Sequence, residues 1–101
     1  MDEFTRQDNL QLSGQVAVVT GGGRGIGRAI AATLSAAGAT TAVLARSVSE
    51  IEATVCMIKQ AGGRARSFVV DVTDAATVER TFAQIQRSLG PVTLLVNNAS
   101  G

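Results

Sequence analysis

The sequence predicts an α/β fold in which one parallel sheet lies between two layers of helices. Three observations support this prediction. Short apolar segments alternate with segments of helical periodicity along the chain. A glycine-rich run follows the first apolar segment and opens the first helical one. With 101 residues the chain is one domain at most, and we expect a polar N-terminal arm at residues 1–12 followed by a folded domain at 13–101.

Four segments have the composition of buried strands. Residues 15–20 are apolar almost throughout, which is typical of a strand that is covered on both faces. We expect three further strands at 41–45, 66–70 and 92–96.

Each of the first three strands is followed by a predicted helix. Their apolar faces are formed, in order, by Ile26, Ile30, Leu34 and Ala37, by Ile51, Val55 and Ile58, and by Val78, Phe82, Ile85 and Leu89. Glycines at positions 38, 62 and 90 are expected to end these helices. Thr73 or Asp74 is expected to cap the third helix at its N-terminus.

The resulting order βαβαβαβ is that of a Rossmann-type, doubly wound parallel sheet in three layers, α/β/α. Because crossovers between parallel strands are right-handed, the expected strand order is 3-2-1-4. This order places a topological switch between strands 1 and 4. Ligands of such sheets bind outside the carboxyl ends of the strands at the switch.

The run at 20–27, T-G-G-G-R-G-I-G, contains the spacing G-x-x-x-G-x-G. These glycines permit a sharp turn and a close approach to a ligand, and the first turn of the helix offers free N–H groups to an anion such as a pyrophosphate. A nucleotide-binding loop of the Walker type is excluded, because Arg28 and Ala29 stand where a lysine and a hydroxyl residue are needed. The spacing G-x-G-x-x-G does not occur in this run. A flexible turn without a ligand is the alternative, which the position between strand and helix disfavours.

Basic residues border the expected adenosine side of this site. Rossmann-type sites that bind NAD hold the ribose with an acidic residue at the end of strand 2, but Ala45 occupies that position here and Arg46 follows it. Arg24 in the glycine loop reaches the same pocket. Each arginine alone is compatible with a solvated surface charge. The pair favours NADP over NAD, because guanidinium groups form charge-assisted hydrogen bonds with a 2′-phosphate.

Composition excludes several other functions. The net charge is +1 with scattered basic residues, so we expect no nucleic-acid or membrane partner. The polar N-terminus and the single cysteine indicate a cytoplasmic protein. The chain has no histidine, tyrosine or tryptophan, and no cluster of residues suited to a metal. We therefore assign no metal-binding and no catalytic residue to it.

The glycine loop, an Asp-Val step at 71–72 and Asn-Asn-Ala at 97–99 resemble three motifs of the short-chain dehydrogenase/reductase family, in the family's order. Ser100 departs from the glycine that usually follows the third motif. The resemblance implies that Asp71 meets the adenine amino group. Together these observations select as candidate cofactor-binding residues Gly21, Gly23, Arg24, Gly25, Ile26, Gly27, Arg46, Ser47, Asp71, Val72, Asn97, Asn98 and Ala99.

The resemblance also implies a function. Members of this family move a hydride between NAD(P)(H) and a small carbonyl or alcohol substrate, and basic residues at positions like Arg24 and Arg46 imply NADP. We expect a homo-oligomeric parent oxidoreductase, of which this chain supplies the N-terminal, cofactor-binding half. The family's catalytic Tyr-x-x-x-Lys lies beyond strand 4 and has no counterpart here, so the chain alone is expected to be inactive. A non-catalytic dinucleotide-binding module and a structural fragment are the alternatives.

Overall fold

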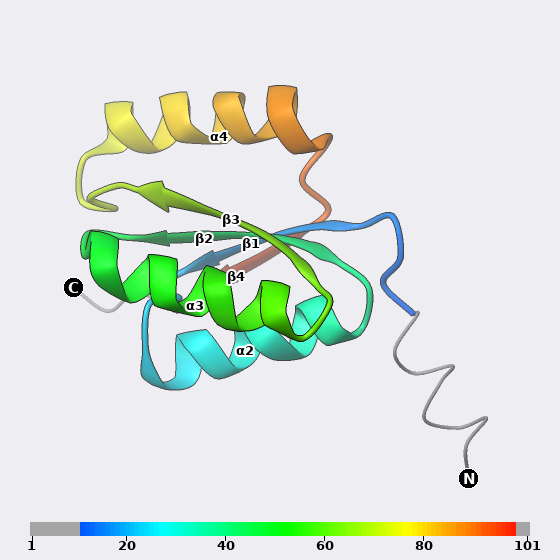
Figure 1. The fold of residues 1–101 in the computed structure, drawn as a ribbon. Helices are drawn as coiled ribbons and strands as arrows, with labels where there is room; N and C mark the ends of the chain where they lie inside the picture. The colour runs from blue at the N-terminus through cyan, green and yellow to red at the C-terminus, as the bar shows by residue number, and fades with distance from the viewer. Residues whose placement is uncertain (1–10, 99–101) are drawn as a thin grey trace, which may run out of the picture.

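The structure, a computed structural model, describes residues 11–98, and strands alternate with helices throughout this range (Figure 1). The elements follow in the predicted order, βαβαβαβ. They are β1 (Val16–Thr20), α2 (Gly25–Ala36), β2 (Thr40–Ala45), α3 (Val48–Gln60), β3 (Arg64–Val69), α4 (Ala75–Leu89) and β4 (Leu94–Asn97).

The four strands form one parallel sheet in the order β3-β2-β1-β4, which confirms the predicted topology. Most strand ends lie within one residue of the prediction, but the starts of β3 and β4 differ from it by two residues. β3 begins two residues earlier because Arg64 pairs in register with Thr40 at the edge of the sheet. β4 begins two residues later, because the hydroxyl of Thr93 takes the place of a backbone carbonyl and accepts the N–H of Val16 over 3.2 Å.

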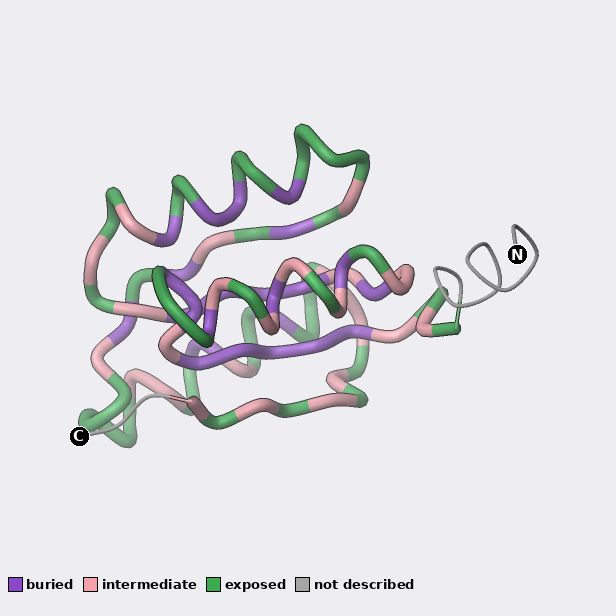
Figure 2. Tube along the Cα trace, turned by 90° about the horizontal axis from the view of Figure 1, so that it is seen from below, coloured by how far each residue is buried: buried purple, intermediate pink, exposed green. Residues whose placement is uncertain are grey.

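Helices cover both faces of the sheet, as the three-layer prediction requires. α2 and α3 lie on one face and α4 lies on the other (Figure 1). Each face has its own apolar core: Ile51 and Ile58 of α3 pack with Val43, whereas Ile85 of α4 packs with Leu44 on the opposite side. Continuous buried segments of the trace run along the central strands (Figure 2), and every residue of β1 is buried, as expected for a strand covered on both faces.

The predicted face of α2 is wrong in one respect. Ile26 is 73% exposed, and the buried residues of α2 are Gly27, Ala31 and Ser35. Ile30 and Leu34 are only partly buried beside them. Because these buried side chains are small, the helix approaches the sheet closely, and the larger apolar residues are displaced to its flank.

Helix ends follow the predicted chemistry. Gly38 and Gly62, which come directly after the C-caps of α2 and α3, both have positive φ angles. Gly90 is the C-cap of α4. At the N-terminus of α4 the structure selects Asp74 over Thr73, since the Asp74 carboxylate accepts the N–H and the hydroxyl of Thr77 over 3.3 and 2.9 Å.

This cap makes stability depend on pH. Hydrogen bonds from the Thr77 hydroxyl, and then from its N–H, lower the pKa of Asp74. A lowered folded-state pKa contributes stability that is present above the unfolded pKa of about 3.9 and is lost as the pH falls through the folded value. We expect Asp74→Asn, which keeps a good N-cap, to flatten the fall of the melting temperature between about pH 5 and pH 2. Thermal melts across this range measure the effect. If the melting temperature of Asp74→Asn fell with pH as steeply as that of the wild type, this would contradict the role of Asp74.

Candidate functional site

The carboxyl ends of β1, β2 and β4 surround a hollow of ≈500 Å³ at the predicted topological switch. Its lining includes six of the predicted site residues, namely Gly21, Arg24, Gly25, Arg46, Ser47 and Asn98. Ala45 and Glu50 also line it. Residues that are far apart in the sequence are thus brought to one place, as the switch-point rule predicts.

The geometry of the loop requires glycine at two positions in particular. Gly25 has a φ angle of +60°, a region that other residues rarely adopt. At Gly27 an ideal Cβ atom would overlap the carbonyl oxygen of Gly21 and would lie 2.7 Å from Nδ2 of Asn98. The first turn of α2 is therefore packed directly against the preceding loop, and only glycine fits there.

The N-terminus of α2 differs from those of α3 and α4. Ser47 and Asp74 cap α3 and α4 through side-chain oxygens, whereas the N-cap of α2, Arg24, makes no side-chain hydrogen bond to the helix. The first turn of α2 also contains no acidic residue. The positive end of the helix dipole therefore faces the hollow, in an arrangement that suits a phosphate group.

Both predicted arginines lie at the hollow, and each has an acidic neighbour. Arg24 Nη1 lies 3.9 Å from Glu50 Oε2, and Arg46 Nη1 lies 4.0 Å from Asp71 Oδ2. The arginine side chains are 82% and 79% exposed, so these ion pairs are weak. The Thr73 hydroxyl, then the Thr73 N–H and, to a smaller extent, Arg46 lower the pKa of Asp71, so this carboxylate is charged at neutral pH.

Hydrogen bonds connect the end of β4 to the glycine loop. The N–H of Asn98 donates to the Thr20 hydroxyl over 3.0 Å, and Nδ2 of Asn98 donates to the carbonyl oxygen of Gly21 over 3.3 Å. The Thr20 hydroxyl donates to Oδ1 of Asn97 over 3.0 Å. These asparagines therefore position the loop, in addition to any contact with a cofactor.

The other predicted site residues in the described range do not line the hollow, namely Gly23, Ile26, Gly27, Asp71, Val72 and Asn97. Gly23 is buried against Glu50, whereas Ile26 and Val72 are exposed beyond it. Ala99 lies outside the described residues. Cofactor contact by the whole predicted set stays a prediction.

Sequence reasoning missed a cluster behind the loop that we call the clasp, formed by Arg28 of α2 and Thr54 of α3. The Arg28 guanidinium donates to the carbonyl oxygen of Gly23 and, through Nε, to the Thr54 hydroxyl over 2.9 Å. That hydroxyl donates to the carbonyl oxygen of Gly22 over 2.9 Å. One sequence signal was available, because Thr54 is a polar residue next to the apolar stripe of Ile51 and Val55, and it is fully buried.

We expect Thr54→Val to lower the free energy of unfolding by about 1–3 kcal/mol, because it leaves buried polar groups of Gly22 and Arg28 without a partner. Thr54→Ser should restore most of the loss. Thr33→Val, at an exposed position of α2, should change stability by less than about 0.5 kcal/mol. Urea unfolding curves of the three variants test this. Equal losses for Thr54→Val and Thr33→Val would contradict the clasp.

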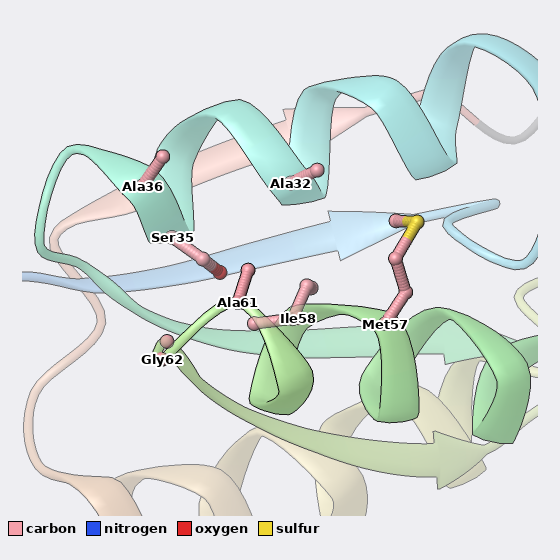
Figure 3. A pocket seen from close by; sticks show the side chains of 8 residues that line it. Ala32, Ser35, Ala36, Met57, Ile58, Ala61 and Gly62 are labelled. Atoms are coloured by element: carbon pink, nitrogen blue, oxygen red, sulfur yellow. The ribbon is translucent and has the colours of Figure 1, made fainter.

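A second hollow, of ≈200 Å³, lies between the C-terminal parts of α2 and α3 (Figure 3). Its lining consists mainly of small or apolar residues, among them Ala36, Met57 and Ile58. The Ser35 hydroxyl is already paired with that of Thr41 over 2.8 Å. This hollow lies toward the amino ends of the strands and does not belong to the glycine-loop site.

Within residues 11–98, no three His, Cys, Asp or Glu side chains gather in a way that would hold a metal ion. In the same range no helix has the length and apolar character needed to cross a membrane.

Comparison with known proteins identifies the family. The family model described as short chain dehydrogenase matches residues 15–101. The chain belongs to the short chain dehydrogenase family. This finding accounts for the topology and for the glycine loop.

The chain spans a small part of some members of the family and most of another. It is 40% identical over 89 residues to a short chain dehydrogenase of Pseudocercospora fijiensis, covering 88% of this chain but 29% of that protein. It is 44% identical over 92 residues to the short-chain dehydrogenase/reductase homolog YusS of Bacillus subtilis, covering 90% of this chain and 84% of YusS.

A solved structure supports the fold directly. A metagenomic short-chain oxidoreductase in complex with NADP superposes with a TM-score of 0.86 at 41% identity, covering 89% of this chain and 41% of that one. This chain therefore shares the fold of about two fifths of that oxidoreductase.

Proposed function

We propose that this chain binds NADP(H) as the cofactor-binding part of an oxidoreductase that interconverts a carbonyl compound and an alcohol by hydride transfer. The observation that carries the proposal is the hollow itself. The uncapped N-terminus of α2 and the guanidinium groups of Arg24 and Arg46 face it from neighbouring elements.

The chemistry of these groups fits the dinucleotide. The N-terminus of α2 suits the pyrophosphate, since backbone N–H groups and the helix dipole both favour an anion there. Arg24 and Arg46 suit a 2′-phosphate, and Ala45 places no carboxylate where one would repel it. The metagenomic relative that was solved with NADP supports the same choice. The proposed substrate is a small carbonyl or alcohol.

Arg46→Ala tests the preference for NADP(H). It should weaken NADPH binding by about 1.5–3 kcal/mol, or roughly 10- to 150-fold in Kd. NADH binding should change far less, because NADH has no 2′-phosphate. The chain has no tryptophan or tyrosine, so the fluorescence of the reduced cofactor can be titrated without interference from these residues.

Arg87→Ala is the matched control, because Arg87 lies on α4 in the other helical layer, and it should leave both affinities unchanged. Equal losses of NADPH and NADH binding in Arg46→Ala would mean that Arg46 has a structural role and does not read the phosphate.

A non-catalytic dinucleotide-binding module is the second candidate. One observation favours it. This chain spans most of the homolog YusS, so a relative of similar length exists. Hydride transfer assays distinguish the candidates. Turnover of NADPH with a panel of carbonyl compounds by the longest native form of the protein supports the oxidoreductase, whereas tight binding without turnover supports the module.

A further inference from the structure

Within residues 11–98, Glu50 is the one acidic residue that lines the hollow, and the sequence did not single it out. Its Oε2 lies 3.9 Å from Nη1 of Arg24. An ideal Cβ atom on Gly23 would lie 3.0 Å from Cβ and 3.4 Å from Oε1 of Glu50, so this side chain lies against the glycine loop. The carboxylate is therefore next to a guanidinium group that the proposed function assigns to the 2′-phosphate.

The backbone of Glu50 is held in place from three directions. Its N–H donates to the N-cap hydroxyl of Ser47 over 3.3 Å. Its carbonyl oxygen accepts from Arg28 Nη2 over 3.4 Å and lies 3.2 Å from Thr54 Oγ1, whose one hydrogen is donated to Gly22. The clasp thus ties the first turn of α3 to the glycine loop. The proximity of Glu50 to Arg24 is fixed by this framework, and only the side-chain torsions are free to change.

The four charges at the site cancel, because Arg24 and Glu50 form one pair and Arg46 and Asp71 form the other. The two carboxylates differ in what else they contact. Oδ1 of Asp71 also accepts the N–H and the hydroxyl of Thr73, over 2.9 and 2.6 Å. For the Glu50 carboxylate, by contrast, the polar interaction found among the described residues is the ion pair with Arg24. A phosphate that binds Arg24 must displace the Glu50 carboxylate from it, or bind with that negative charge close by and be repelled by it.

We infer that Glu50 is a specificity-determining residue, whose carboxylate competes with the 2′-phosphate of NADP(H) for Arg24 and so limits the preference of the site for NADP(H) over NAD(H). This inference rests on the proposed function. NAD(H) carries a neutral hydroxyl in place of the 2′-phosphate, so it has no group at this position that competes with Glu50 for Arg24. If Glu50 instead accepted a hydrogen bond from the ribose 2′-hydroxyl, its neutralisation would weaken NAD(H) binding.

The test is a titration of NADPH and NADH into the wild-type chain, Glu50→Gln, Arg24→Met and the double variant. Glu50→Gln should bind NADPH about 2- to 5-fold more tightly, a gain of the size expected for relief of an exposed charge interaction, with little change for NADH. The gain should disappear in the Arg24→Met background and shrink with added salt. Glu52→Gln is the matched control, since Glu52 lies on the same helix but outside the hollow.

Three outcomes would overturn the inference. Unchanged or weaker NADPH binding by Glu50→Gln, in a wild type that prefers NADPH, would overturn the inference and leave the proposed function intact. A gain that persists without Arg24 would show that the carboxylate acts by another route. A wild type that binds NADPH no more tightly than NADH would overturn the inference together with the proposed function. Thermal melts of each variant show that the affinities refer to folded protein.

Discussion

Gly27→Ala is expected to destabilise the protein by at least about 3 kcal/mol, because the new Cβ atom would overlap the carbonyl oxygen of Gly21 and crowd the side chain of Asn98. Neither neighbour moves easily. The Gly21 N–H is bound to the carbonyl oxygen of Leu44 over 2.8 Å, and the Asn98 N–H is bound to Thr20. Urea unfolding measures the loss, and the folded fraction should no longer bind NADPH tightly.

Gly62→Ala is the control for this substitution. Gly62 has a φ angle of +90°, but no atom lies within 4 Å of its ideal Cβ position. The cost there should be confined to the backbone conformation, about 1–2 kcal/mol, with NADPH affinity unchanged. If the two substitutions proved equally costly, the contact between Gly27 and the loop would not be what excludes a side chain.

Leu44→Ala is expected to cost about 2–5 kcal/mol, the range for deleting a large buried aliphatic side chain. Leu44 is fully buried between the sheet and α4, where it packs with Val18 and Ile85. Its carbonyl oxygen, which accepts the N–H of Gly21, remains in the variant. We therefore expect a large loss in urea unfolding and little change in the dinucleotide affinity of the folded protein.

Leu95→Ala is the matched control, because it is the same chemical change in a neighbouring part of the same sheet. Leu95 pairs with Val18 in register but is 58% exposed. Its truncation should cost less than about 1 kcal/mol, since little apolar surface is removed from the core. A cost equal to that of Leu44→Ala would mean that Leu95 is buried in solution.

The same pair of leucines shows what the sequence leaves open. Both stand in apolar segments of strand composition, and both strands were predicted. Local pattern does not reveal that α4 covers one leucine and not the other. The exposure of Ile26 and the small-residue face of α2 escaped prediction for the same reason, because how closely a helix packs on a sheet depends on all the side chains between them.

The sequence by itself determined the order of the elements, the strand order and the place of the glycine loop. Periodicity and glycine positions are local signals, and the rules of chain connection then leave few topologies for parallel strands. It also nominated Arg24 and Arg46 for the same hollow, since the ends of parallel strands meet at one edge of a sheet.

Only the tertiary structure decided how these groups are held and what they face. The clasp joins Arg28 to Thr54, which are 26 residues apart, and Glu50 faces Arg24 because the clasp sets the first turn of α3 against the loop. Such contacts depend on the distance between two elements that pack on the sheet independently. No spacing within either helix encodes that distance, and for this reason the counter-charge of Arg24 could be found only in the folded chain.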